Sequence, residues 1–263
     1  MSARRFWVFI EQQEGEVHPV SWELLGVARR LASQVQEEAA ENGDETLVEG
    51  VLLGYNVQSI AEDAIRYGAD RVYVVDDEVL KNYRNCPYYE SIVAIAEKYE
   101  PEVFLIGATT LGRDLAGAVA TSLHTGLTAD CTKLEMGDVR GADKKLLLAT
   151  RPAFGGNIMA TIVCRKHEPQ MSSVRPRVFP IPEYDPDAEG EIVHVPMDLT
   201  EEGALTCILE FIREKGESVD IEYSDVIVSG GRGIGGPEGF EVIQSLADDL
   251  GGVVGASRPC VDA

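Results

Sequence analysis

The sequence is poor in cysteine, in basic residues and in long apolar runs. Its cysteines are scattered at Cys86, Cys131, Cys164, Cys207 and Cys260. No Cys-x-x-Cys pair occurs among them, so we expect reduced, mostly buried thiols and no metal site. No run approaches the roughly 18 apolar residues of a membrane span, and no signal-peptide core follows Arg4 and Arg5. We therefore expect a cytoplasmic protein without a membrane span.

Basic residues are outnumbered by acidic ones. Lysine and arginine total 23, aspartate and glutamate total 45, and the formal net charge is −22. A nucleic-acid backbone would be repelled, so nucleic acid is not an expected partner, and neither is an anionic membrane surface. The excess of carboxylates fits either a salt-rich cytoplasm or simple colloidal repulsion.

The remaining composition is that of an ordinary folded protein. Hydrophobic residues make up 44% and charged residues 26% of the 263 positions, which is enough for a sizeable core. This length suits one large domain and one smaller unit. No internal repeat or low-complexity tract is present.

Apolar runs of strand length alternate with helical patterns, which predicts parallel strands joined by crossover helices. The predicted strands are Phe6–Ile10, Val48–Gly54, Arg71–Val75 and Val103–Ile106. The predicted helices are Trp22–Ala40, Val57–Tyr67, Ser91–Tyr99 and Arg113–Leu123. Three later strands, expected in the same sheet, are Cys131–Met136, Lys145–Thr150 and Ile158–Cys164. The fold class is therefore α/β, with a Rossmann-like, three-layer parallel-sheet domain.

A proline-rich stretch, Arg175–Pro182, marks the approach to a domain boundary, and the acidic segment Glu183–Glu191 is expected to be an exposed loop. We predict a first domain over residues 1–197. Residues 198–263 would then hold a linking helix, Leu205–Lys215, and the start of a second, doubly wound domain.

The most distinctive motif is a glycine-rich turn, 229–240, between the predicted strand Asp225–Ser229 and an apolar-periodic helix. Gly231, Gly233 and Gly236 satisfy G-x-G-x-x-G, a spacing that lets backbone amides approach a pyrophosphate. A tight structural turn is the alternative.

The next predicted strand, Val253–Ala256, ends in Ser257 and Arg258. An NAD-binding fold would place a carboxylate here to bind the ribose hydroxyls. An arginine suits a phosphate or an electron-rich ring better, so NADP or a flavin is favoured over NAD. An exposed surface charge is the alternative for Arg258.

These segments resemble the FAD domain of electron-transfer flavoprotein α subunits. The resemblance rests on Val-Ser-Gly-Gly-Arg-Gly from Val228, on Leu-Ala-Asp-Asp-Leu-Gly from Leu246, and on Val-Gly-Ala-Ser-Arg-Pro-Cys-Val-Asp-Ala from Val254. The first domain is similar to the family in four further segments: 6–12, 107–115, 126–131 and 151–158. The resemblance covers essentially the whole chain.

The resemblance implies roles for individual residues. Arg232 and Ser257 match family positions that contact FAD, and Arg258 matches the arginine placed over the flavin ring. Gly231 and Gly233 are the expected cofactor-binding glycines, and no catalytic or metal-binding residue is implied. The family's other FAD contacts lie beyond residue 263, so we expect the chain to end inside the FAD domain, and residues 1–263 to hold little FAD alone.

The function implied is that of an electron carrier and not of an enzyme. Members of this family pair with a β subunit and pass electrons from flavin dehydrogenases, such as those acting on acyl-CoA in fatty acid β-oxidation, to a quinone oxidoreductase. In the family, residues 151–157 lie near the partner subunit and the flavin. Together with residues 169–176, this segment is more similar to the microbial branch, which includes flavin-based bifurcating members, than to the mitochondrial one. The alternatives are an NADP-dependent oxidoreductase and a cofactor-free partner-docking fragment.

Overall fold

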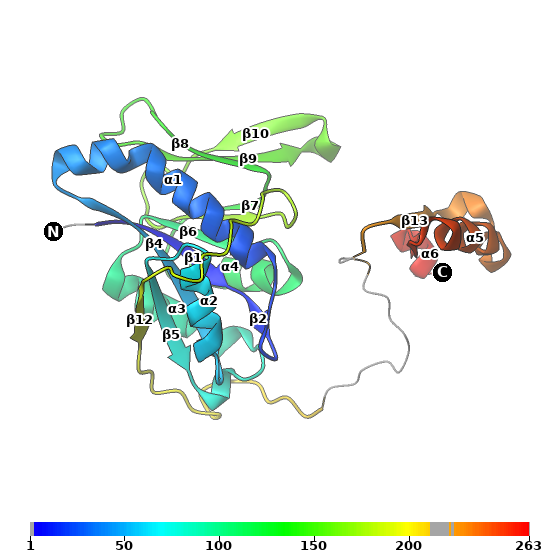
Figure 1. Ribbon diagram of the computed structural model, residues 1–263, viewed down its shortest axis with the longest axis horizontal. Helices are drawn as coiled ribbons and strands as arrows, with labels where there is room; N and C mark the ends of the chain where they lie inside the picture. Colours follow the sequence, from blue (N-terminus) through cyan, green and yellow to red (C-terminus); the bar gives the residue numbers. More distant parts are fainter. Residues whose placement is uncertain (1–2, 211–220, 222–223, 263) are drawn as a thin grey trace. The chain divides into compact units, whose positions relative to one another are not determined.

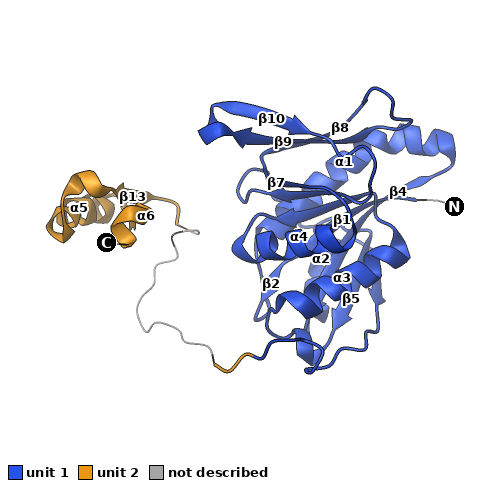
Figure 2. Ribbon diagram, turned by 180° about the vertical axis from the view of Figure 1, so that it is seen from behind, with its two compact units in different colours: residues 1–207 blue, residues 208–263 orange. Residues whose placement is uncertain are grey.

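A computed structural model describes residues 3–210, 221 and 224–262, and the chain divides into two compact units, residues 1–207 and 208–263 (Figure 2). Each unit has its own sheet. The domain boundary expected after residue 197 stays a prediction. None of the helices among the described residues is long and apolar enough to cross a membrane.

The first unit is built on a seven-stranded sheet in which every neighbouring pair is parallel, in the order β12-β5-β4-β1-β6-β11-β7 (Figure 1). Its strands are β1 (Ala3–Ile10), β4 (Glu45–Gly54), β5 (Arg71–Asp76), β6 (Val103–Gly107), β7 (Leu127–Cys131), β11 (Gln170–Val174) and β12 (Glu191–His194). The central strands are buried on both faces, which explains their unbroken apolar runs. A short hairpin, β2 (Gln12–Gln13) with β3 (Glu16–Val17), follows β1.

Helices cover both faces of this sheet and make the three predicted layers. The crossover helices are α1 (Val20–Asn42), α2 (Gln58–Arg66), α3 (Asn85–Tyr99) and α4 (Thr110–Ser122). Alternate residues of β1 face opposite ways, so Phe6 and Val8 join the apolar cluster of α1 and α2, while Trp7 and Phe9 join that of α3 and α4. The Rossmann-like α/β class is therefore confirmed.

The prediction that the last three strands of the first domain join the main parallel sheet is wrong. In the structure β8 (Lys133–Gly137), β9 (Leu146–Ala153) and β10 (Ile158–Ile162) form a separate antiparallel sheet. Their connections are too short for the crossover that a parallel pair needs. The main sheet is completed instead by β7, β11 and β12. Of these, β11 is fully buried, but its sequence Gln-Met-Ser-Ser-Val is mostly polar, so the apolar pattern of a buried strand is absent.

The second unit contains two parallel strands, β13 (Ile227–Gly230) and β14 (Val253–Ala256), with helix α5 (Phe240–Leu250) between them in the chain. Helix α6 (Arg258–Val261) follows β14. The linking helix predicted over 205–215 is not present in its described part, 205–210, and the rest of it lies outside the described residues.

Helix α4 begins where the backbone passes unusually close to β6. Thr109 caps the helix by accepting a hydrogen bond from the Gly112 amide at 2.8 Å. A Cβ atom on Gly112 would lie 2.0 Å from the carbonyl oxygen of Gly107, so only glycine fits there. Gly117, in the same helix, has no such neighbour: apart from its own helix, no atom of the described residues lies within 4 Å of an added Cβ.

We expect Gly112→Ala to lower the free energy of unfolding by about 3 kcal/mol, because the added methyl group forces α4 away from β6. Gly117→Ala is the matched control and should raise stability by about 0.5–1 kcal/mol, since it only restricts the unfolded chain. Urea unfolding of both variants measures the difference. Equal stabilities would show that the close approach does not fix the helix.

Candidate functional site

The carboxyl end of the first unit's central sheet is filled by its own side chains. The strand order of the main sheet reverses between β1 and β6, and doubly wound folds usually bind ligands at such a point. Here the Glu11 carboxylate accepts a hydrogen bond from Thr109 Oγ1 at 2.7 Å, and the Glu11 amide donates to Ser21 Oγ at 2.9 Å. Glu11 is 7% exposed. The polar groups at this point are thus bound to one another, and the glycine turn of the second unit is the stronger candidate.

In the second unit one backbone hydrogen bond brings the two sequence motifs together. The strands β13 and β14 pair in parallel, with Gly230 beside Ala256. The Ser257 amide then donates to the Gly230 carbonyl at 2.9 Å. Because both strands end at this edge, the turn that begins at Gly231 and the pair Ser257-Arg258 leave the sheet side by side.

The glycine turn is longer than a simple strand-to-helix connection. Two short 3₁₀ turns, Arg232–Ile234 and Pro237–Gly239, precede α5. Gly235 adopts a φ of +94°, a conformation that favours glycine. The apolar-periodic helix that the sequence predicts after the turn begins at Phe240.

The glycines of this turn fall into two groups. A Cβ on Gly239 would lie 2.4 Å from the Ile234 carbonyl oxygen, and one on Gly230 would lie 2.8–3.0 Å from side-chain atoms of Ile234 and Phe240. By contrast, apart from chain neighbours, no atom of the described residues lies within 4 Å of a Cβ built on Gly233 or Gly236. Packing within the protein therefore explains the first group but not the second.

A cavity of about 490 Å³ opens beside the turn. Its lining residues are Gly231, Arg232, Ile234, Gly235, Gly236, Pro237, Phe240, Pro259 and Cys260. Of the five predicted site residues, Gly231 and Arg232 are in this lining. Gly233 lies within the turn, and Ser257 lies next to the lining, its Oγ 3.5 Å from the position of an added Gly231 Cβ. Arg258 is next to the lining residue Pro259.

Arg258 is exposed and held by a residue that the sequence reasoning did not single out. Its side chain is 84% exposed, and its Nε donates to both carboxylate oxygens of Asp262, at 2.9 and 2.7 Å. The four-residue spacing on α6 was the available signal. Cys260, also missed, places its Sγ 3.5 Å from Ser257 Oγ.

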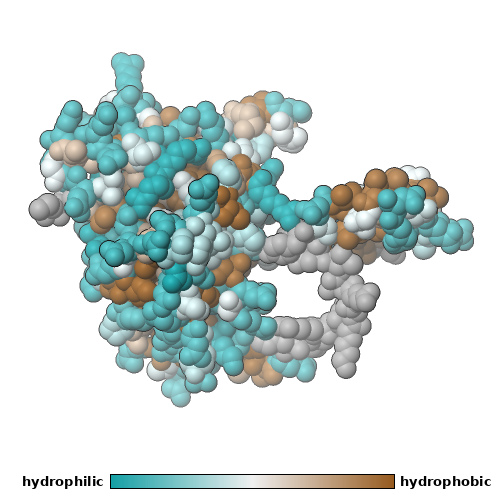
Figure 3. Space-filling model, in the orientation of Figure 1, coloured by the Kyte–Doolittle hydropathy of each residue, from teal (hydrophilic) through white to brown (hydrophobic). Residues whose placement is uncertain are grey.

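Helix α5 presents an apolar stripe on its outer side. Ala247 is buried in the unit, whereas Val242, Leu246 and Leu250 are exposed at four-residue intervals. Figure 3 shows apolar (brown) residues on this unit. A stripe of this kind marks a surface that another protein segment can cover.

The segment 151–157 forms the tip of an antiparallel hairpin. It joins β9 to β10, and Phe154 at the tip is 82% exposed. Arg151 lies near Asp130, whose pKa is lowered chiefly by its hydrogen bond to Arg175, at 2.6 Å. Among the described residues, no cluster of three His, Cys, Asp or Glu side chains could hold a metal ion.

A glycine-rich turn beside a Ser-Arg pair, both at the carboxyl ends of parallel strands, defines an α/β protein of the nucleotide-cofactor-binding class. Two family models match the chain: the electron transfer flavoprotein domain over residues 6–199, and the electron transfer flavoprotein FAD-binding domain over residues 220–263. The chain belongs to the electron transfer flavoprotein α-subunit family, and its C-terminal match is to the family's FAD-binding domain.

Curated relatives cover nearly all of this chain. The chain is similar to the electron transfer flavoprotein subunit alpha of Thermoanaerobacterium thermosaccharolyticum, with 49% identity over 98% of this chain and 74% of the relative. It is similar to the subunit alpha of Megasphaera elsdenii, with 47% identity over 98% and 73%. The protein FixB of Azorhizobium caulinodans is 45% identical over 98% of this chain and 67% of its own length.

The two groups of glycines should respond differently to substitution. Gly239→Ala should disrupt the turn, because its methyl group would overlap the Ile234 carbonyl. Gly233→Ala should leave the protein's fold unchanged, because its added Cβ meets open space. Backbone amide NMR spectra of both variants provide the measurement: widespread shifts from Ile234 to Phe240 are expected for Gly239→Ala only. Comparable shifts in both variants would contradict this division.

Proposed function

We propose that this chain is the α subunit of an electron-transfer flavoprotein, which binds FAD together with a β subunit and carries electrons from flavin dehydrogenases, such as acyl-CoA dehydrogenases, to a quinone oxidoreductase or another carrier. The observation that carries the proposal is the convergence of Gly231-Arg232 and Ser257-Arg258 at one sheet edge, in a domain that matches the family's FAD-binding domain.

The described residues fit FAD. At Gly233 and Gly236 the described residues leave room for a Cβ, yet both positions are glycine. Without a Cβ, a pyrophosphate can approach the backbone closely at these two positions. Gly231 and Arg232 line the cavity, so the Arg232 guanidinium can pair with a phosphate group. Ser257 and Cys260 lie beside each other at the edge of the cavity and can bind polar atoms of the ring. FAD, when bound, supplies the capacity to accept and release electrons.

We infer that Arg258 tunes that capacity. Asp262 holds the guanidinium through Nε alone. The two Nη groups are therefore the donors that can face the flavin. A cation beside the ring stabilises added negative charge and raises the reduction potential.

The β9–β10 hairpin supports a docking role toward the β subunit. Four apolar side chains are exposed on it: Phe154, Ile158, Met159 and Ile162. In addition, β10 is an edge strand whose outer side is unpaired within its sheet. Exposed apolar side chains on an edge strand are typical of surfaces that pair with another chain.

Arg258→Ala should lower the reduction potential of the FAD bound by the complete αβ complex by on the order of tens of millivolts, because a nearby positive charge is lost. Arg258→Lys retains the charge and should shift the potential less. Spectroelectrochemical titration of the flavin absorption bands measures both. Unchanged FAD content and potential in the alanine variant would show that Arg258 is a surface charge. A bound nicotinamide nucleotide would favour an NADP-dependent oxidoreductase, and a colourless complex would favour a cofactor-free docking fragment.

Phe154→Ser combined with Met159→Ser should weaken association with the β subunit by about tenfold or more, because two exposed apolar side chains would no longer be buried on binding. Tyr55→Ser, at another exposed aromatic residue of the first unit, is the control and should leave the affinity unchanged. Calorimetric titration of the α variants with the β subunit provides the dissociation constants. An unaltered constant for the double variant would place the interface elsewhere.

A bifurcating role remains the alternative within the same family. It predicts that the complex reduces two acceptors of different potential from one electron-pair donor, whereas a simple carrier reduces one. Steady-state assays of the αβ complex with both acceptors present separate the two roles.

A further inference from the structure

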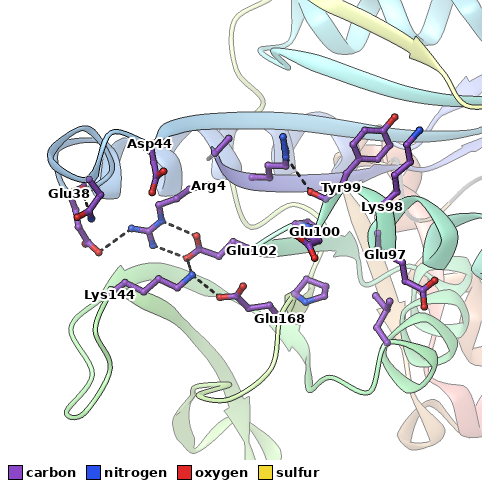
Figure 4. A pocket seen from close by; sticks show the side chains of 17 residues that line it. Arg4, Glu38, Asp44, Glu97, Lys98, Tyr99, Glu100, Glu102, Lys144 and Glu168 are labelled. Carbon is purple, nitrogen blue, oxygen red and sulfur yellow. Dashed lines mark hydrogen bonds and ion pairs between the residues drawn. The ribbon is translucent and has the colours of Figure 1, made fainter. Parts of the chain in front are cut away.

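Two polar cavities adjoin at the amino ends of β6 and β11. The first, of about 860 Å³, surrounds the ion pair of Arg4 with Glu102 (Figure 4). The second, of about 590 Å³, lies between the β8–β9 loop and the segment that leads from β10 to β11. Both are lined by Lys144 and Glu168, whose charged groups are 2.7 Å apart. In the first cavity the buried arginine already donates to the carboxylates of Glu38 and Glu102 and to the Lys145 carbonyl, which leaves the second as the candidate site.

One buried donor in the wall of the second cavity has no partner in the described part of the chain. Gln170, the first residue of β11, lines the cavity and is 2% exposed. Its Oε1 accepts a hydrogen bond from the Leu147 amide at 2.8 Å, which fixes the orientation of the side-chain amide. The Nε2 group has no hydrogen-bond partner among the described residues. A buried donor left unsatisfied costs about 1–3 kcal/mol, so an acceptor from outside the chain is expected at this point.

Cationic side chains surround this donor in a chain that has few of them. Lys144, Arg165, Lys166 and His167 line the cavity, against the carboxylates of Asp143 and Glu168. Lys144 is already paired with Glu168 and Glu102, whereas Arg165 donates a long hydrogen bond to the Arg140 carbonyl, at 3.5 Å. The Glu102 carboxylate lies 3.5 Å from Lys144 Nζ and offsets its charge as well, so Arg165 and Lys166 carry the positive charge that is left for a ligand.

We propose that this cavity binds a small oxyanion of the phosphate class. Gln170 Nε2 donates to one anionic oxygen, and the Arg165 and Lys166 side chains, both exposed at the cavity's edge, supply the compensating charge. The cavity volume lies within the roughly 300–1,000 Å³ of typical ligand pockets, so a phosphate monoester of a small polar molecule fits as well as free phosphate. This site lies in the first unit and is independent of FAD binding.

Calorimetric titration of the full chain with inorganic phosphate, at constant ionic strength set with chloride, tests the proposal. We expect saturable binding that Gln170→Glu weakens by about tenfold or more, because a carboxylate oxygen replaces the buried Nε2 donor. Lys166→Gln, at an exposed position where folding is not at risk, should also weaken binding. Lys133→Gln removes an exposed lysine of the same small sheet, paired with Glu135, and should have no effect.

Titration with glycerol phosphate separates the two sources of the oxyanion. Tighter binding of the ester than of free phosphate assigns the cavity to a phosphate monoester, and equal binding assigns it to the free anion. The proposal is wrong if phosphate shows no saturable binding, or if Lys166→Gln and Gln170→Glu bind it as the unaltered chain does. A crystal grown in phosphate with only a water molecule on Gln170 Nε2 would lead to the same conclusion.

Discussion

The hydrogen bond from the Ser257 amide to the Gly230 carbonyl is the interaction on which the candidate site depends. It continues the β13–β14 pairing by one residue beyond the strands, at 2.9 Å. The strand pairing brings the glycine turn and the Ser-Arg pair to one edge, and this hydrogen bond fixes the position of the first residue after β14. The bond joins two backbone atoms, so no residue type in the sequence indicates it. It can be inferred only from the fact that both strands end at the same edge of the sheet.

Glycine serves two different purposes around that hydrogen bond. Gly230, Gly239, Gly252 and Gly255 are glycines because protein atoms lie less than 3 Å from where a Cβ would be. Gly233 and Gly236 have no such restriction from the described residues. The G-x-G-x-x-G pattern in the sequence cannot separate the two groups, because spacing does not tell whether a neighbour is protein or ligand. The structure separates them, because it shows which of these glycines lie against protein atoms and which face open space.

The sequence predicts the central strands of the first unit well, because a strand buried on both faces must be a continuous apolar run. It fails at β11, where Ser172 and Ser173 are buried inside the sheet, and at β8–β10, where the alternation of a two-faced sheet was taken for further parallel strands. In the site, the prediction of Arg232, Ser257 and Arg258 rests on resemblance. Asp262 and Gln170 could not be predicted from the sequence. Their roles depend on individual atoms: Asp262 binds Nε of Arg258, and Gln170 is bonded through Oε1 but not through Nε2.

The Arg258–Asp262 pair shows how an exposed arginine can be held in place while some of its N–H donors stay available to a ligand. Ion pairs between exposed side chains contribute only about 0–1 kcal/mol, so this one does not hold the fold together. Its effect is instead to limit the rotamers of a long side chain, since Nε is the bonded atom and Nη1 and Nη2 are not. A ligand that binds the Nη groups need not break the pair, and it gains a cation whose freedom is already partly restricted. The same logic applies to Gln170, where a bond to Oε1 aims the opposite nitrogen.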